Sequence, residues 1–245
     1  MKIKNASFAL VIVLCVSTAL SAHAQSFRPL YTFTGGADGG GPIGGLIRDA
    51  EGNLYGTTCC EGAYGAGTVF MVDKSGSETV LYSFTGGADG DQPYASLIRD
   101  SKGNFYGTTY WGGTSTACNG GTGCGVVFKL DTSGNETVLH AFSGTGGDGA
   151  NPYDGLVQDA KGNLYGTTVS GGRSSACSGG CGVVFGVNTA GKEAVLYSFG
   201  KVGDGAGPYA GLVLDAEGNL YGTTYYGGAY CAGYGGCGTV YKVTP

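Results

Sequence analysis

The stretch Gly-Asn-Leu-Tyr-Gly-Thr-Thr at residues 52–58 occurs four times in this chain of 245 residues. The other copies begin at Gly103, Gly162 and Gly218, and the copy at Gly103 has Phe in place of Leu. Successive copies are 51, 59 and 56 residues apart. Self-similarity at a period of about 50 residues is the signature of a tandem array built from one supersecondary unit.

Further marks flank this stretch in the same order in every copy. An Asp-Gly-x-x-Pro turn begins at Asp38, Asp89, Asp148 and Asp204, and an apolar run ends at Asp49, Asp100, Asp159 and Asp215. After the stretch, Gly-x-Val-Phe/Tyr begins at Gly67, Gly125, Gly182 and Gly238, and Leu-Tyr/His-x-Phe begins at Leu81, Leu139 and Leu196, with an extra copy at Leu30. Short runs rich in β-branched and aromatic residues between Gly, Asn and Asp predict strands joined by turns.

Four short strands per repeat predict an all-β protein, a β-propeller of four blades with four antiparallel strands each. We assign the blades to about residues 34–84, 85–142, 143–199 and 200–245, within a single domain of residues 25–245. The fourth repeat stops after its third strand, so we expect residues 27–33 to supply the outer strand and close the ring, which would hide two sheet edges. An open solenoid, or a larger ring made by two chains, is the alternative.

Residues 1–24 have the pattern of a secretory signal peptide. Lys2 and Lys4 precede an apolar run, and Ala22-His23-Ala24 has the small-x-small form of a cleavage site. A retained membrane anchor is the competing interpretation, but the apolar stretch is short for a span of about 20 residues. We therefore predict cleavage near Ala24 and a protein that is secreted, periplasmic or at the cell surface, with no membrane span after removal of the signal.

The composition restricts the partners of the chain. Its formal net charge is -5, and charged residues make up 13% of it. Nucleic-acid binding requires a basic surface that neutralises phosphates, so it is not expected here. The 52 glycines recur at regular places in the repeats, and aromatic residues make up 11% of the chain. Both features favour a folded protein over a disordered one.

The repeated Gly-Leu-Ile/Val-x-Asp-(Ala/Ser)-x-Gly-Asn-Leu-Tyr-Gly-Thr-Thr pattern and the later Gly-x-Val-Phe resemble the GloVer-type tandem-repeat proteins of bacterial exteriors, described as choice-of-anchor. The resemblance extends over all four copies, from about Phe27 to Val243. It implies a surface or secreted propeller without an assigned activity. A C-terminal anchor is missing from the pattern here, which leaves attachment to the surface open. The strand-and-turn pattern is more weakly similar to NHL-type and lactonase-type propellers.

The cysteines outside the leader fall mostly into local pairs. Three repeats place two cysteines in one Gly-rich segment, which predicts the disulfides Cys118–Cys124, Cys177–Cys181 and Cys231–Cys237. The first repeat instead has adjacent Cys59 and Cys60, for which we expect a vicinal disulfide, with an intermolecular bridge as the alternative. A zinc site is disfavoured because the compartment is oxidising and His140 is the single histidine after the leader.

In a propeller blade, the loop entering the inner strand and the loop between the second and third strands open on the same face. The candidate ligand-binding residues on that face are Asp38, Asp89, Asp148, Asp204, Tyr94, Tyr153, Tyr209, Tyr110, Trp111, Tyr225 and Tyr226. The acidic ring could bind Ca²⁺, which takes oxygen ligands, and the aromatic side chains could stack on sugars. Alternatively, Asp-Gly is an ordinary turn dipeptide and the tyrosines pack between blades.

We identify no catalytic residue. His140 stands where the other repeats have tyrosine, so we expect it to replace an aromatic side chain, which leaves no Ser-His-Asp or Cys-His set. We therefore expect a binding or interaction module, with glycan or cell-envelope material as the ligand and no cofactor apart from the Ca²⁺ considered above. The alternatives are a carboxylate- or metal-dependent hydrolase or lyase on the same face, and a purely structural extracellular scaffold.

Overall fold

The computed structural model describes residues 26–118, 120–229 and 236–245, and this part of the chain contains β-strands and no helix. The first two repeats form β1 (Ile47–Arg48), β2 (Leu54–Thr58), β3 (Thr68–Val72) and β4 (Glu78–Ser83), then β5 (Ile98–Arg99), β6 (Phe105–Thr109), β7 (Val126–Leu130) and β8 (Glu136–Ala141). The next two form β10 (Val157–Gln158), β11 (Leu164–Thr168), β13 (Val183–Val187) and β14 (Glu193–Ser198), then β16 (Val213–Leu214), β17 (Leu220–Thr224) and β19 (Thr239–Val243). The predicted all-β class is confirmed.

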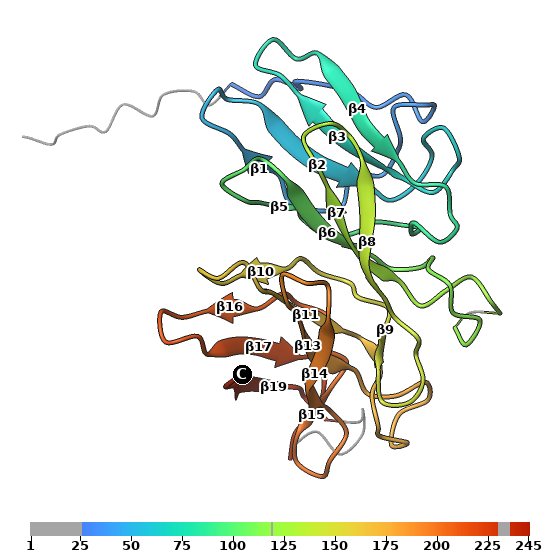
Figure 1. Ribbon diagram of the computed structural model, residues 1–245, viewed down its shortest axis with the longest axis vertical. Coiled ribbons are helices and arrows are strands. Elements are labelled where there is room, and N and C mark those ends of the chain that lie inside the picture. Colours follow the sequence, from blue (N-terminus) through green and yellow to red (C-terminus); the bar gives the residue numbers. More distant parts are fainter. Residues whose placement is uncertain (1–25, 119, 230–235) are drawn as a thin grey trace, which may run out of the picture.

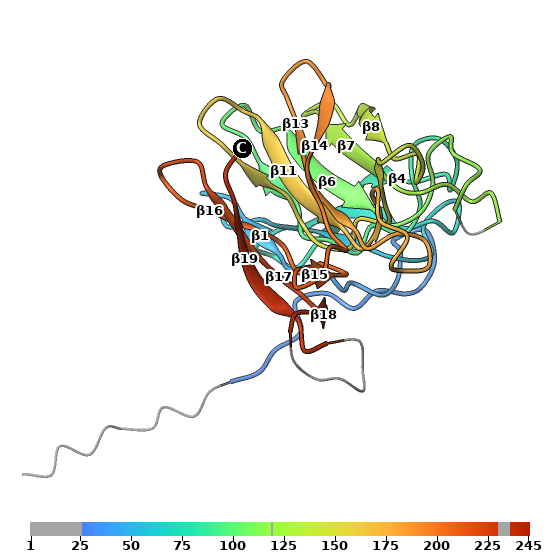
Figure 2. The same ribbon diagram turned by 90° about the horizontal axis from the view of Figure 1, so that it is seen from below.

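Each repeat forms one main antiparallel sheet in which the strands are ordered as in the sequence. Three sheets have four strands, and the sheet of the fourth repeat has three, β16-β17-β19. The blades follow one another along the long axis of the molecule, from blue to red in Figure 1. The short inner strands β1, β5, β10 and β16 lie along one side of this array (Figure 1), and Figure 2 shows the same sheets from below.

A glycine in the second strand of each blade makes room for an aromatic ring of the third. Gly107 pairs with Phe128 across β6 and β7, and a Cβ atom at Gly107 would lie 2.7 Å from the Phe128 ring. The ring therefore occupies space that a side chain on β6 would take. Phe128 has no exposed surface and belongs to the core cluster of the first two blades.

Successive blades meet through the same edge-to-face aromatic contact. Phe84 at the end of the first blade lies 5.1 Å from Phe128 in the second, measured between ring centroids. The corresponding distance is 5.0 Å for Phe142 and Phe185, and 5.0 Å for Phe199 and Tyr241. Edge-to-face pairs at this distance are a favoured aromatic geometry. The Phe of each Leu-Tyr/His-x-Phe run is thus the side chain that joins one blade to the next.

The ring is not closed in the way we predicted. Residues 27–33 form no strand, and β19 pairs with β17 alone within the described residues. Phe33 instead contacts Phe70 of the first blade, with 4.9 Å between centroids, while β19 lies at the far end of the array (Figure 1). Phe33 thus contacts the first blade as Phe84 contacts the second, and within the described residues the segment does not pair with β19.

Three of the predicted disulfides are present, namely Cys59–Cys60, Cys118–Cys124 and Cys177–Cys181. Cys237 is also disulfide-bonded, whereas its predicted partner Cys231 lies outside the described residues. The predicted signal peptide, residues 1–24, lies outside them as well. Within the described residues, no helix is long and apolar enough to cross a membrane.

Candidate ligand-binding surface

The loop that enters each blade lies beside the loop that leaves its second strand. Asp91 and Trp111 form an antiparallel bridge in the second repeat. In the third, β9 (Gly149–Ala150) pairs with β12 (Ser170–Gly171), and in the fourth, β15 (Gly205–Ala206) pairs with β18 (Tyr226–Gly227). The common face expected from the order of the strands is therefore formed.

The aromatic residues predicted on this face form one continuous series of ring contacts, which we call the aromatic tract. It consists of Trp111, Tyr110, Tyr94, Tyr153, Tyr209, Tyr225 and Tyr226, in that order. Neighbouring centroids lie 4.6 to 5.9 Å apart, from Tyr225–Tyr226 to Tyr209–Tyr225. Tyr153 is the centre of the tract, because it contacts Tyr94, Tyr110 and Tyr209.

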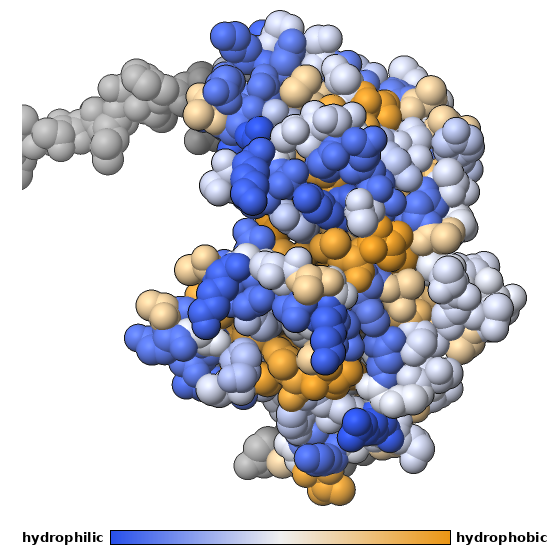
Figure 3. Space-filling view, viewed as in Figure 1, coloured by the Kyte–Doolittle hydropathy of each residue, from blue (hydrophilic) through white to orange (hydrophobic). Residues whose placement is uncertain are grey.

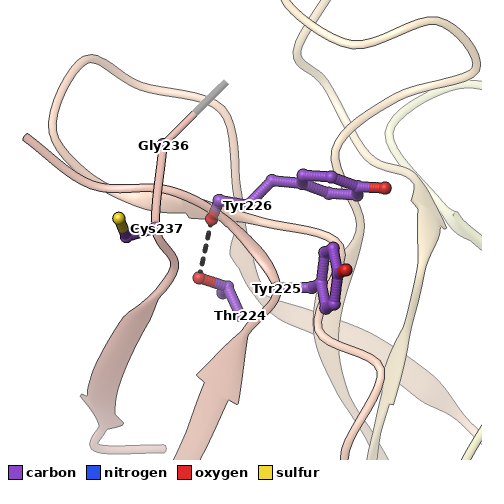
Figure 4. A pocket seen from close by; sticks show the side chains of 5 residues that line it. All are labelled: Thr224, Tyr225, Tyr226, Gly236 and Cys237. Carbon is purple, nitrogen blue, oxygen red and sulfur yellow. Dashed lines mark hydrogen bonds between the residues drawn. The ribbon is translucent and has the colours of Figure 1, made fainter. Parts of the chain in front are cut away.

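The tract becomes more exposed toward the fourth blade. Tyr94, Tyr110 and Trp111 are partly buried, whereas Tyr209 is 40% exposed and Tyr225 is 66% exposed. Beside Tyr225 and Tyr226 lies a hollow of about 580 Å³, which Thr224, Gly236 and Cys237 also line. Figure 4 shows the two tyrosine rings on one side of this hollow and the hydrogen bond that Thr224 Oγ1 donates to the Tyr226 carbonyl, 2.9 Å long.

The first blade contributes no aromatic side chain to the tract. Cys59 and Cys60 follow the Thr-Thr pair of the first repeat as Tyr110 and Trp111 follow that of the second. The Cys60 backbone pairs with Gly40 as that of Trp111 pairs with Asp91. The vicinal disulfide thus takes the place of an aromatic pair, and the tract extends over the second, third and fourth blades.

The four aspartates of the predicted acidic ring do not join the tract. Asp89 accepts hydrogen bonds from the Tyr82 hydroxyl, 2.9 Å long, and from the Thr85 backbone N–H, 2.8 Å long. The other three carboxylates each have two partners of the same kind, a side chain before the loop and a backbone N–H within it. These partners are Tyr31 and Thr34 for Asp38, His140 and Ser143 for Asp148, and Tyr197 and Gly200 for Asp204. The four carboxylates therefore offer the predicted Ca²⁺ site no set of converging ligands.

These turn contacts also determine the protonation of the carboxylates. Hydrogen bonds from the Thr34 hydroxyl and backbone N–H lower the pKa of Asp38 to about 2. The second set of aspartates behaves alike: Asp215 accepts from the side chain and backbone N–H of Asn219, which lower its pKa to about 2. Asp38 and Asp215 therefore stay ionised in neutral solution, and both sets of aspartates stabilise turns by accepting backbone N–H bonds.

Sequence reasoning missed the polar residues that support the tract. Gln92 accepts a hydrogen bond from the Tyr94 hydroxyl, 2.6 Å long, and the Asn151 side-chain amide donates to the Tyr110 carbonyl, 3.1 Å long. Both residues precede the Pro of an Asp-Gly-x-x-Pro turn and have positive φ, 57° and 60°. Glycine stands at this position in the first and fourth repeats, as Gly41 and Gly207. A polar residue at a position where the other repeats have glycine was the signal in the sequence that Gln92 and Asn151 have a special role.

A second cluster, which shares no residue with the tract, lies at the boundary of the second and third blades. His140 on β8, Asp148 in the following loop and Glu193 on β14 each offer a ligand atom, and these atoms lie within 4.8 Å of one another. It is the one such group of three His, Cys, Asp or Glu side chains in the described part of the chain. The sequence reasoning expected His140 to replace an aromatic residue, and its ring does contact Phe142 edge-to-face as Tyr82 contacts Phe84.

The model of the Gloeobacter/Verrucomicrobia repeat matches residues 18–122 and 115–245. The chain belongs to this repeat family. The match extends over the four repeats, and it confirms the resemblance seen in the repeated motif. No curated protein matches the chain.

Three of the solved structures that match the chain cover most of its length. A protein assigned as a gluconolactonase is 18% identical with a TM-score of 0.44, over 82% of this chain and 63% of that one. A luciferin-regenerating enzyme is 16% identical (TM-score 0.44; 82% and 60%), and a protein from Bacteroides uniformis assigned as a 6-phosphogluconolactonase is 18% identical (TM-score 0.44; 81% and 56%). The repeat-family chain thus spans about 60% of the length of these structures.

Proposed function

We propose that this repeat protein is an extracytoplasmic binding module that recognises polysaccharide of the cell envelope or its surroundings through the aromatic tract. The observation that carries the proposal is the unbroken series of seven rings from Trp111 to Tyr226. Tyrosine and tryptophan combine an apolar ring face with a polar group that bonds in water. This combination suits a sugar, whose ring offers C–H groups on its faces and hydroxyls at its edge.

The shape of the tract favours a polymer over a small ligand. Small-molecule sites are usually enclosed cavities that bury most of their ligand. The aromatic tract instead runs across three blades, and its members Tyr153, Tyr209, Tyr225 and Tyr226 are 38 to 66% exposed. A chain of sugar units could contact several rings in succession, and the contacts would add along its length.

Asp91 places a carboxylate beside one end of the tract. Its backbone pairs with Trp111, and burial raises the pKa of its side chain above the ordinary value. Sugar hydroxyls donate readily to carboxylates, and a hydrogen bond to an ionised acceptor is stronger than a neutral one. Asp91 is therefore the polar contact that we expect at the Trp111 end.

The test is a binding screen of the purified chain against insoluble polysaccharides and soluble oligosaccharides of increasing length. We expect affinity to rise with chain length and to fall at least tenfold, about 1.4 kcal/mol, in Tyr153→Ala and in Tyr209→Ala. Tyr64→Ala is the matched control, because Tyr64 is 66% exposed but takes part in no ring contact of the tract. A ligand that binds equally well to the Tyr153→Ala/Tyr209→Ala double variant would refute the proposal.

A further inference from the structure

The cluster of His140, Asp148 and Glu193 joins two blades. His140 lies on β8, the outer strand of the second blade, and Glu193 lies on β14, the outer strand of the third. The Nε2 atom of His140 is 3.4 Å from Oδ1 of Asp148. The two side chains are 20% and 17% exposed, so the cluster is sheltered but open to ions from solution.

The boundary between the second and third blades differs from the preceding boundaries in having a histidine where they have a tyrosine. Tyr82, Asp89 and Glu136 occupy the corresponding places between the first and second blades, and the Tyr82 hydroxyl donates to Asp89 over 2.9 Å. Tyr31 donates to Asp38 in the same way, over 2.8 Å, near Glu78. A phenol is a poor ligand in its protonated form, whereas neutral imidazole is a common metal ligand. Replacement of Tyr by His therefore changes a hydrogen-bonded pair into a set of three possible ligands.

Glu193 contributes a carboxylate oxygen to this cluster. Its Oε1 atom is buried and has no hydrogen-bond partner. A buried acceptor without a partner costs free energy, and a cation between the three side chains would remove that cost.

We propose that His140, Asp148 and Glu193 bind one Zn²⁺ ion that links the second and third blades. One imidazole nitrogen and two carboxylate oxygens form a ligand set that Zn²⁺ accepts at about 2.0–2.2 Å, with water in the fourth position. Tetrahedral ligands at that distance lie about 3.3 Å apart, a separation that His140 and Asp148 already have within 0.1 Å, at 3.4 Å. Ca²⁺ fits less well, because it prefers a larger set of oxygen ligands.

The site is separate from the aromatic tract and independent of the proposed glycan binding. It also differs from the zinc site that the sequence argument disfavoured, because the cysteines take no part in it. Cys118 and Cys124 are joined to each other, and two of the three ligands are carboxylates. The proposed Zn²⁺ site therefore needs only one histidine ligand.

The experiment is a titration of the EDTA-stripped, oxidised full chain with Zn²⁺ alone, followed by calorimetry and by metal analysis after dialysis. We expect one equivalent per chain and a rise in the unfolding temperature with Zn²⁺, because a ligand stabilises the state that binds it. Tyrosine is the residue at the equivalent positions 31, 82 and 197, so His140→Tyr is a variant that the repeat accommodates. It should bind at least 100-fold more weakly and lose the Zn²⁺-dependent rise.

Glu193→Gln and Glu136→Gln form a matched pair. Glu136 begins β8 as Glu193 begins β14, and its Oε1 atom is likewise buried without a partner, but it faces Tyr82 instead of a histidine. We expect at least tenfold weaker Zn²⁺ binding in Glu193→Gln and unchanged binding in Glu136→Gln. Absence of a bound equivalent of Zn²⁺ in the wild type would overturn the proposal. Retention of full Zn²⁺ affinity in His140→Tyr would overturn it as well, because the one remaining histidine, His23, is not part of the proposed site. Unfolding in EDTA confirms that each variant is folded.

Discussion

Val240 is 83% exposed, whereas Val184, at the same register position one blade earlier, has no exposed surface. Val240 pairs with Thr223 as Val184 pairs with Thr167, so only the neighbourhood differs. Val184 lies in a core cluster with Leu212 and Leu220 of the following repeat, whereas Val240 belongs to no core cluster of the described residues. Figure 3 shows apolar surface near β19, at the lower end of the molecule.

The same substitution at these two valines should therefore have different effects. We expect Val184→Ala to lower the free energy of unfolding by about 2 kcal/mol, because it removes buried apolar surface. Val240→Ala should stay within about 0.5 kcal/mol of the wild type. Urea unfolding followed by fluorescence measures both, and equal losses would show that β19 is covered in solution.

The close approach of β6 to an aromatic ring makes Gly107 sensitive to substitution. A Cβ atom there would lie 2.7 and 2.9 Å from two atoms of the Phe128 ring and 3.1 Å from Leu97. We expect Gly107→Ala to destabilise the protein by about 1–3 kcal/mol, the usual effect of overpacking. Gly36→Ala is the control, because its Cβ would meet nothing closer than 3.4 Å. Thermal unfolding of both variants checks the prediction, and a stable Gly107→Ala would contradict the packing described here.

Glu136 gives the stability a dependence on pH near neutrality. Burial, with a smaller effect of Asp89, raises its pKa from 4.5 to about 7. The folded protein thus holds this proton where the unfolded chain has released it, so the contribution is complete below pH 4.5 and is lost as the pH rises through 7. We expect Glu136→Gln to be more stable than the wild type at pH 8 and to show a flatter dependence between pH 4.5 and 8. Glu217→Gln, at an exposed position, should keep the wild-type profile.

The two disulfides inside the Gly-rich loops should each have a small effect. They connect cysteines six and four positions apart, Cys118–Cys124 and Cys177–Cys181. Loops this short lose little entropy on closure, so replacing both cysteines of a pair by serine should cost about 2 kcal/mol. Denaturant unfolding of the two double variants tests this. Loss of the folded state in either variant would contradict this prediction, because it would show that the disulfide stabilises more of the protein than its own loop.

Local features of the repeat could be predicted from the sequence. The strands of each unit and the turns after Asp49, Asp100, Asp159 and Asp215 follow from residues within a few positions of one another. The local disulfides followed from spacing alone. The gathering of the tyrosines followed from the order of strands, because loops on the same face of successive blades must be neighbours.

Ring closure could not be predicted, because it depends on the angle between blades. That angle is set where side chains of two repeats pack, as at Phe84 and Phe128, and the repeated motif does not encode it. The hydrogen bonds of the acidic ring were overlooked for a different reason. The tyrosine that binds each aspartate lies seven residues before it in three repeats, as in Tyr82 and Asp89, and this constant spacing was the overlooked signal.

One hydrogen bond from a threonine recurs at each of the three boundaries between blades. Thr108 donates a hydrogen bond to the carbonyl of Asp154 in the next repeat, Thr167 donates to that of Ala210, and Thr57 donates to that of Ala95. Each of the first three repeats thus supplies a threonine hydroxyl as the donor, and the next repeat supplies a backbone carbonyl as the acceptor. Such a chain is a polymer of interchangeable segments: duplication or loss of one segment in the gene leaves every remaining joint complete, so evolution can change the length of the array without redesigning it.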